Sequence, residues 1–595
     1  MIPERLSRLR EKMKEANVDL YMVTSADFHA SEYVGDYFKA RAYITGFTGS
    51  AGTAVITQDG AWLWTDGRYF IQAAAQLSGT TVTLQKMGQD GIPTVEEFIL
   101  DRIRSGETLG FDGRTVPAAE GEKYARLLAK KGAKVASGRD LVGEIWQDRP
   151  ALSAEPVFEL DVRYAGQERS EKLHNLFDAM DKEGADALVL TSLDDIAWLL
   201  NIRGGDVAYN PVVLSYLLAK KDHTVYLYAN SSCFPEAVVH ALEKDGVTIR
   251  PYNNIYTDIA AIPAGSTLMA DKSRTNYAIV GNVPEGVTLI NRINPTYLPK
   301  SIKNPTEVEN EKLAHIKDGV AMTRFIYWLK THIGKEKITE MSAAAKIESF
   351  RQMGENYLGQ SFAPIVSYGA HAAMCHYSPS AESDIEIEPH GFALADTGGQ
   401  YYEGTTDITR TFAVGPLSYE QKHHYTLVLR GHLHLAAARF LYGCTGVALD
   451  YACRAPLWDE ALDYNHGTGH GVGYLLNVHE GPNSFRYRIV PDHNAVMEEG
   501  MITSNEPGLY LEGKYGIRIE NMIVCRKDVK NEYGQFMAFD NLTYIPYEPE
   551  AVLPEEMTEK ERALYNDYMA QVYEKISPYL SEEEKVWLKN ETRPI

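Results

Sequence analysis

The chain has 595 residues, of which 44% are hydrophobic and 24% are charged, a composition typical of globular proteins and unlike disordered, fibrous or small disulfide-rich chains. Lys and Arg number 59 against 81 Asp and Glu, and the formal net charge of −22 argues against nucleic acid as a partner. The sequence contains no apolar run of about 18 residues, its N-terminus lacks the apolar core of a signal peptide, and its five cysteines are scattered. We therefore expect a cytoplasmic protein without a membrane partner.

Two segments in the first half of the chain share one pattern. An amphipathic helix predicted over residues 4–16 leads into the apolar run VDLYMVTS at 18–25. A second helix, predicted over 168–183, leads into ADALVLTS at 185–192. The second apolar run begins 167 residues after the first, and β-branched and aromatic runs follow both. The pattern indicates one α/β unit used twice.

The chain divides into three predicted domains, residues 1–150, 151–303 and 304–595. The first two are interpreted as related α/β domains. An Asn-Pro dipeptide opens the third and signals a turn, and Thr306 is the expected cap of a helix that continues to about residue 330. Beyond this helix Tyr, His and Gly become denser, so we expect the chemistry in the third domain.

Four segments of the third domain carry acidic or imidazole side chains in strand-like or glycine-flanked positions. They contain Asp396 and Asp407 in LADTGGQYYEGTTDITRT, His470 in NHGTGHGVGYLLNVHEGP, Glu506 in TSNEPGLY, and Glu520 in YGIRIENM. A buried carboxylate is costly unless it is paired or bound to a cation. Each residue alone could be an ion-paired core acid or a satisfied histidine, but the five together favour a site for two divalent ions. Oxygen-dominated ligation with one nitrogen suits Mn²⁺, and also Co²⁺ or Zn²⁺.

The order Asp, Asp, His, Glu, Glu with these flanking residues resembles the pita-bread metallopeptidases, and among them most closely the three-domain Xaa-Pro aminopeptidases. The resemblance extends over nearly the whole chain. HASEYVGDYFKARAYITGFTGSAGTAVI and LWTDGRYFIQAA are similar to the first domain of that group, and HGTGHGVGYLLNVHEGP, TSNEPG and GIRIEN to its catalytic motifs. The fold that the resemblance implies is α/β, with two creatinase-like N-terminal domains followed by an α+β catalytic domain of the pita-bread type.

The resemblance also implies a role for each ligand. Asp396 would chelate one metal ion, and Asp407 would bridge both. His470 and Glu506 would bind the second ion, and Glu520 would bridge again. The cofactor would be two divalent ions, Mn²⁺ before Zn²⁺ or Co²⁺.

Three residues would be catalytic by the same resemblance. Glu506 would take a proton from a water that bridges the two ions. His479 would contact the substrate and steady the intermediate or the departing nitrogen, and His376 would be a second histidine in contact with the substrate. The implied activity is removal of the first residue from short peptides with proline at the second position, by a homodimer.

Two other functions stay open at this point. A dipeptidase of the prolidase type would use the same site, although that resemblance is to a shorter, two-domain chain. A pita-bread domain can also bind partners without catalysis after losing its ligands, whereas all five ligand positions here carry usable side chains.

Five further histidines need an interpretation. Four lie on one predicted helix, YEQKHHYTLVLRGHLHLAAARF, for which no carboxylate partner is apparent, and we expect a partly solvated helix face there: His423, His424, His432 and His434. His466 lies four positions before His470 across glycines, so the two do not form a helical ligand pair. We expect His466 to support the site without binding metal.

Overall fold

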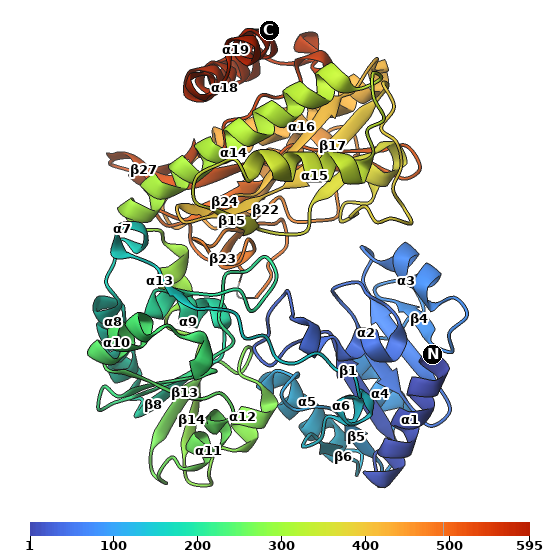
Figure 1. Cartoon of the computed structure of the whole chain (residues 1–595), viewed down its shortest axis with the longest axis vertical. Coiled ribbons are helices and arrows are strands. Elements are labelled where there is room, and N and C mark those ends of the chain that lie inside the picture. Colours follow the sequence, from blue (N-terminus) through green and yellow to red (C-terminus); the bar gives the residue numbers. More distant parts are fainter. Residues whose placement is uncertain (492) are drawn as a thin grey trace. The chain divides into compact units, whose positions relative to one another are not determined.

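The computed structural model (Figure 1) describes residues 1–491 and 493–595 and separates two compact units. The first unit comprises Met1–Glu159 and Glu168–Thr296, and the second comprises Leu160–Gln167 and Tyr297–Ile595. The α/β class predicted from the sequence is confirmed, because both units combine sheets with helices. The exact boundaries of the three predicted domains stay a prediction.

The first unit contains two six-stranded sheets. The strands of the first sheet are β1 (Leu20–Thr24), β2 (Thr53–Ile56), β3 (Ala61–Thr65), β4 (Thr83–Lys86), β5 (Thr108–Gly110) and β6 (Lys134–Ala136). Those of the second sheet are β8 (Ala187–Leu190), β10 (Tyr216–Lys220), β11 (Val225–Ala229), β12 (Val247–Pro251), β13 (Thr267–Ala270) and β14 (Thr288–Asn291). The strand orders are β4-β3-β2-β1-β5-β6 and β12-β11-β10-β8-β13-β14.

The two sheets have the same topology, which confirms the internal repeat. In each, the inner strand β1 or β8 pairs antiparallel with the strand on one side and parallel with the strand on the other. The predicted helices precede these strands as α1 (Ile2–Glu15) and α8 (Arg169–Glu183). Further helices of this unit are α2 (Ala40–Thr45), α3 (Phe70–Leu77), α4 (Val95–Arg102), α5 (Ala118–Ala129), α6 (Leu141–Ile145), α9 (Leu193–Leu200), α10 (Glu236–Lys244), α11 (Asn254–Ala260) and α12 (Tyr277–Gly281).

The second unit is built around one six-stranded sheet and smaller sheets beside it. Its strands are β15 (Tyr357–Gln360), β16 (Ile365–Tyr368), β17 (Phe392–Thr397), β18 (Gly399–Tyr401), β19 (Gly404–Thr405), β20 (Ile408–Ala413), β21 (Arg439–Leu441), β22 (Gly469–Gly471), β23 (Glu480–Phe485), β24 (Ile502–Asn505), β25 (Gly508–Leu511), β26 (Tyr515–Arg518), β27 (Asn521–Asn531) and β28 (Gly534–Asn541). The large sheet has the order β21-β28-β27-β24-β22-β23, and two three-stranded sheets have the orders β16-β17-β20 and β15-β18-β19. β25 pairs with β26.

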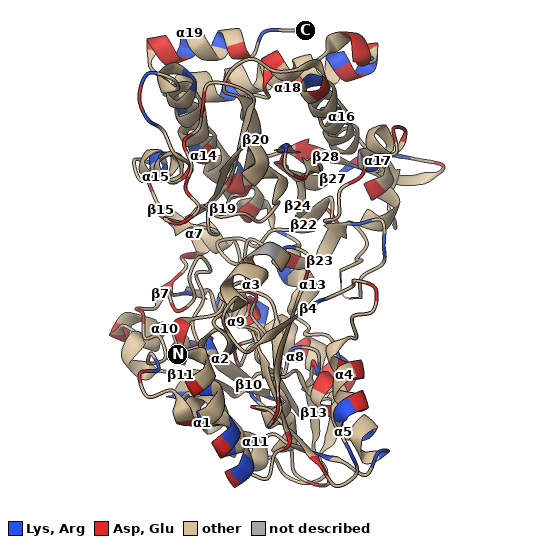
Figure 2. Ribbon diagram, turned by 90° about the vertical axis from the view of Figure 1, so that its right-hand side faces the viewer, with Lys and Arg blue, Asp and Glu red and all other residues tan. Residues whose placement is uncertain are grey.

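In the described part of the second unit, helices accompany these strands. They are α7 (Val162–Ala165), α13 (Tyr297–Ser301), α14 (Pro305–His332), α15 (Glu340–Arg351), α16 (Tyr419–Ala436), α17 (Gly446–Trp458), α18 (Glu559–Ile576) and α19 (Glu582–Glu591). Acidic and basic residues are interspersed along outer helices such as α1, α4 and α19 (Figure 2). Within the described ranges, no helix combines the length and the apolar character that a membrane span requires.

Helix α14 begins one residue before the predicted cap. Asn304 is the N-cap: its side-chain oxygen accepts a hydrogen bond from the backbone N–H of Glu307 at 3.0 Å, and the Glu307 carboxylate accepts one from the backbone N–H of Asn304 at 3.0 Å. Pro305 occupies the first helical position, where its missing N–H costs nothing. The expectation that Thr306 is the cap is therefore wrong, because this capping box is formed by its neighbours.

The four histidines predicted on one helix lie on α16, but only part of their face is solvated. His432 is fully buried. His423 is placed between two carboxylates, with its ring nitrogens 2.7 Å from Glu556 and 2.8 Å from Glu460. His434 also has a carboxylate partner, with Nε2 2.7 Å from Glu561. These partners were not apparent from the sequence, because they lie outside the helix.

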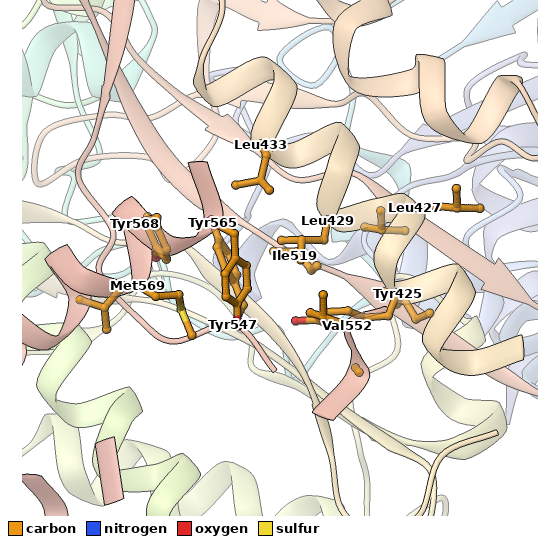
Figure 3. Close-up of a cluster of buried hydrophobic side chains, with 14 of the residues drawn as sticks. Tyr425, Leu427, Leu429, Leu433, Ile519, Tyr547, Val552, Tyr565, Tyr568 and Met569 are labelled. Atoms are coloured by element: carbon orange, nitrogen blue, oxygen red, sulfur yellow. The ribbon is translucent and has the colours of Figure 1, made fainter. Parts of the chain in front are cut away.

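Tyrosine is prominent in a hydrophobic core of the second unit (Figure 3). Tyr547 stacks on Tyr568 with ring centroids 4.4 Å apart, and Tyr425 and Tyr565 are buried in the same cluster. Tyr565 and Tyr568 belong to α18, and Tyr425 belongs to α16. Helix α18 is thus part of this core, and its apolar burial stabilises the unit.

A buried arginine ties the C-terminal region to the strands of this unit. The guanidinium of Arg410, on β20, donates to the carbonyl of Glu520 at 2.6 Å and to the carbonyl of Ile545 at 3.0 Å. It also donates to the hydroxyl of Tyr568 at 3.0 Å and to the side-chain oxygen of Asn521 at 2.7 Å. One side chain therefore satisfies acceptors on three separate segments.

Replacement of Arg410 by Met is expected to lower the free energy of unfolding of the second unit by about 3 kcal/mol or more, because several buried acceptors would lose their donor. Chemical denaturation followed by near-UV circular dichroism measures the change. Arg526→Met is the matched control, since Arg526 is 40% exposed and its ion pairs contribute little. Equal stability of the two variants would contradict this role of Arg410.

Candidate metal centre

Two antiparallel strands bring the predicted aspartates together. Asp396 lies on β17 and pairs with Thr409 of β20, and Asp407 directly precedes β20. Both carboxylates are buried, at 8% and 4% exposure. The pairing of β17 with β20 thus explains how aspartates eleven positions apart reach the same place.

His470 and Glu506 come from neighbouring strands of the large sheet. His470 is the central residue of β22, and Glu506 directly follows β24, which pairs with β22. The Nε2 atom of His470 lies 3.4 Å from Oδ2 of Asp407 and 3.5 Å from Oε1 of Glu506. Glycine is required before the histidine because a Cβ at Gly469 would lie 1.9 Å from the carbonyl oxygen of Ser504.

Glu520 completes the group of predicted ligands. It lies between β26 and β27 at 1% exposure. Potential ligand atoms form three overlapping groups, each within 4.8 Å: Asp396, Asp407 and Glu520; His470, Glu506 and Glu520; and Asp407, His470 and His479. The structure thus brings together all five side chains predicted as ligands, and their binding of metal stays a prediction.

Arg518 is a residue of this site that the sequence analysis did not assign. Its guanidinium donates to Oδ2 of Asp396, to the hydroxyl of Tyr510 at 2.7 Å and to Oγ1 of Thr409 at 3.1 Å. Thr409 in turn donates to Oε2 of Glu520 at 2.7 Å. One guanidinium therefore orients two of the predicted ligands, directly and through a threonine. The alternation in IRIEN is the sequence signal for this contact, because it puts Arg518 and Glu520 on one face of an extended strand.

The carboxylates of the site are crowded and shielded from water. Burial raises the pKa of Asp396 to about 7; the guanidinium of Arg518 opposes the rise, and the negative charges of Asp407 and Glu506 add to it. Burial and the neighbouring carboxylates also raise the pKa of Glu520. Like charges held together out of water favour a bound proton or a bound cation.

The other predicted histidines lie around this group. The ring of His479 meets that of His470 edge-on, with 4.4 Å between the ring centroids. Nε2 of His466 lies 2.9 Å from the hydroxyl of Tyr510. Burial lowers the pKa of His466 to about 3; the positive charge of Arg518 adds to the lowering, and His376 contributes less. His466 is therefore neutral and contacts a tyrosine that also binds the site's arginine.

The residues fit a divalent cation. Oδ1 of Asp396 is buried and has no hydrogen-bond partner in the part of the chain that the structure describes. An oxygen-rich set of donors with an imidazole nitrogen suits Mn²⁺, Co²⁺ or Zn²⁺. A cation would bind this oxygen as a ligand and would offset the burial and the repulsion that raise the carboxyl pKa values.

Comparison with protein families agrees with this geometry. The sequence matches metallopeptidase family M24 over residues 309–527 and the C-terminal region of peptidase M24 over residues 535–595. It matches a creatinase/prolidase N-terminal domain twice, over residues 5–145 and 148–307. The two N-terminal matches fall on the two sheets of equal topology in the first unit.

Known aminopeptidases match this chain over its full length. The chain is 39% identical over 615 residues to a probable Xaa-Pro aminopeptidase P of Coprinopsis cinerea, which covers 100% of this chain and 98% of that protein. It is 37% identical over 634 residues to aminopeptidase P2 of Arabidopsis thaliana, and this match covers 100% of the chain and 89% of the relative. The crystal structure of an X-prolyl aminopeptidase from Caenorhabditis elegans, described as a cytosolic enzyme with a di-nuclear active site, is 34% identical, covers 100% of both chains and superposes with a TM-score of 0.94.

The chain belongs to metallopeptidase family M24 and is a hydrolase of the aminopeptidase class. Within that family it groups with the Xaa-Pro aminopeptidases, as the resemblance in its sequence predicted. The predicted fold, two related creatinase-like domains followed by a pita-bread domain, is also confirmed.

Acidification is expected to weaken the binding of divalent ions. Because the pKa of Asp396 is raised to about 7, protons compete with cations for this carboxylate increasingly as the pH falls below that value. Calorimetric titration of metal-free protein with Mn²⁺ between about pH 6 and pH 8, in buffers of different ionisation enthalpy, measures both affinity and proton release. We expect weaker binding and more protons released at the acidic end. Constant affinity without proton release would contradict the raised pKa.

Proposed function

We propose that the protein is a metal-dependent Xaa-Pro aminopeptidase that releases the first residue of peptides with proline at the second position. The observation that carries the proposal is the gathering of Asp396, Asp407, His470, Glu506 and Glu520 at one place, where the three carboxylates of Asp396, Asp407 and Glu520 are buried. Relatives named Xaa-Pro aminopeptidase along the whole chain support the choice of substrate.

The proposed cofactor is a pair of divalent ions, Mn²⁺ before Zn²⁺ or Co²⁺, and the relative with a di-nuclear active site supports the number. Asp396 would hold one ion, and His470 and Glu506 the other. Asp407 and Glu520 would bridge the two. Such a pair supplies a water of lowered pKa between the ions and stabilises both oxygens of a tetrahedral intermediate.

The residues around the ions would move protons and orient the substrate. Glu506 would accept a proton from the attacking water, and the hydroxyl of Ser504 holds its Oε1 at 3.1 Å. His479 would contact the substrate and support the departing nitrogen. His376 would be a second histidine in contact with the substrate. These three roles rest on the resemblance, and that of His479 also on its ring contact with His470.

The chemistry of proline accounts for the need for such an enzyme. An X-Pro amide has no N–H, and its ring fixes the direction of the chain, so a protease that clamps an extended backbone binds it poorly. A metal centre can polarise the amide without using that N–H.

Peptide hydrolysis tests the proposed activity. Metal-stripped protein is assayed before and after addition of Mn²⁺ with Arg-Pro-Pro, Arg-Pro and Arg-Ala-Ala, and the products are identified by mass spectrometry. We expect metal-dependent release of Arg from Arg-Pro-Pro, with little release from the other two. Preference for Arg-Pro would favour a prolidase-type dipeptidase, and absence of any release from folded protein would favour a non-catalytic binding module.

Replacement of Asp407 by Asn is expected to reduce activity to the level of the metal-free protein, since a neutral amide cannot bridge two cations as a carboxylate does. Asp540→Asn is the control, because the Asp540 side chain is 52% exposed on β28 and pairs with Arg526 and not with a predicted ligand. Full activity of the Asp407 variant would refute the metal assignment.

We also propose that the protein is a cytosolic homodimer, as predicted from the sequence. The cytosolic location is supported by the description of the relative from Caenorhabditis elegans. An exposed aromatic cluster supports self-association: Trp458 of α17 lies 6.0 Å from Tyr451 and 5.9 Å from Tyr487 between ring centroids, and these side chains remain 38%, 61% and 42% exposed.

Sedimentation velocity tests the dimer. Tyr451→Asp combined with Tyr487→Asp is expected to shift a dimer to monomer, because charge would oppose burial of the cluster. Tyr533→Asp is the control, since Tyr533 is equally aromatic and 74% exposed at the turn between β27 and β28. A monomeric unaltered protein, or an unaffected dimer in the double variant, would contradict the proposal.

A further inference from the structure

Thr406, the residue before Asp407, is fully buried and connects the two predicted aspartate ligands to the helices of the second unit. We propose that Thr406 is a positioning residue that sets the spacing of Asp396 and Asp407 for metal binding. The inference rests on the proposed function only in taking these two aspartates as ligands.

All polar groups of Thr406 are engaged. Its hydroxyl donates to Oδ2 of Asp318 on α14 and accepts a hydrogen bond from the backbone N–H of Gly399 at 2.8 Å. Its backbone N–H donates to the carbonyl of Gly399 at 2.9 Å. Its carbonyl accepts from the hydroxyl of Ser361 at 2.8 Å. Thr406 is therefore fixed by three separate parts of the chain.

The anchor at Asp318 is itself rigid. Nε of Arg351, on α15, donates to Oδ1 of Asp318 at 2.6 Å, and Nη2 donates to Oδ2 at 3.2 Å. Both side chains are almost fully buried, at 1% and 0% exposure. A bidentate pair of this kind has a defined geometry, and the bond from Thr406 to its carboxylate is charge-assisted. The threonine hydroxyl is thus held by α14 and α15 rather than by a mobile surface group.

The two contacts with Gly399 connect the segments that carry the aspartates. Gly399 is three positions after Asp396, and Thr406 is one position before Asp407. The close approach extends to the preceding glycine, because a Cβ at Gly398 would lie 2.0 Å from the carbonyl oxygen of Thr406. Thr406 therefore joins the two ends of segment 399–406, which connects the two aspartates. Loss of the Thr406 hydroxyl would leave the fold of segment 399–406 intact but would loosen the spacing of the two predicted ligands.

A threonine with a structural role alone would affect stability but not metal binding. The test therefore measures stability and metal binding separately. Thr406→Val keeps the shape of the side chain and removes the hydroxyl, whereas Thr406→Ser keeps the hydroxyl. Thr426→Val is the matched control: Thr426 of α16 is also fully buried, and its hydroxyl donates to Lys422 and accepts from Leu553 at 3.0 Å.

The readouts are the affinity of metal-free protein for Mn²⁺ by calorimetry, the visible absorption spectrum of the Co²⁺-loaded protein, and the thermal midpoint without metal. We expect Thr406→Val to bind Mn²⁺ roughly 10- to 100-fold more weakly and to change the Co²⁺ spectrum, as is typical when a residue that orients a ligand is removed. Thr406→Ser is expected to restore both, and Thr426→Val to lower only the thermal midpoint.

Wild-type affinity and spectrum in a folded Thr406→Val protein would overturn the inference. If that variant does not fold, Ser361→Ala removes only the contact to the Thr406 carbonyl and is expected to weaken Mn²⁺ binding in the same direction; unchanged affinity there would also overturn it. If the unaltered protein binds Mn²⁺ but cleaves no peptide, the proposed function is refuted. The Mn²⁺ affinities of the Thr406 variants still test the role of Thr406 in that case. An unaltered protein that binds no divalent ion would overturn both.

Discussion

Repulsion among carboxylates held out of water is the constraint on which the second unit depends. Asp396, Asp407 and Glu520 are each less than 10% exposed. The carboxylates of Asp407 and Glu506 both lie within 3.5 Å of Nε2 of His470. Arg518 supplies one positive charge, yet the pKa values of Asp396 and Glu520 remain raised. Such a group is stable only when protons or cations neutralise it, and at neutral pH divalent cations are the neutralising species that also supply chemistry.

The surrounding structure holds these charges in place against their repulsion. The pairing of β17 with β20 brings the two aspartates to one place, and the large sheet places His470 beside Glu506. Arg410 fixes the backbone at Glu520 and binds helix α18 through Tyr568. Rigid strands and buried arginines thus prepare the ligand positions, so that little ordering remains to be done when ions bind.

The sequence alone predicts the features that local patterns encode. The helix-strand repeat appears as two sheets of one topology, and the five predicted ligands are recognisable because each lies in a glycine-flanked or strand-like segment. Contacts between distant segments were not predictable. The bond from Arg518 to Asp396 joins residues 122 positions apart, and His423 finds Glu556 after 133 positions. Periodicity describes one element at a time and carries no information on which elements pack together.

Anomalous X-ray diffraction from crystals soaked in Mn²⁺ tests the central claim most directly. The account predicts two peaks, roughly 3.5–4 Å apart, one near Asp396 and the other near His470 and Glu506, with Asp407 and Glu520 in contact with both. A single peak, or peaks away from these five side chains, would contradict a two-ion centre at this place.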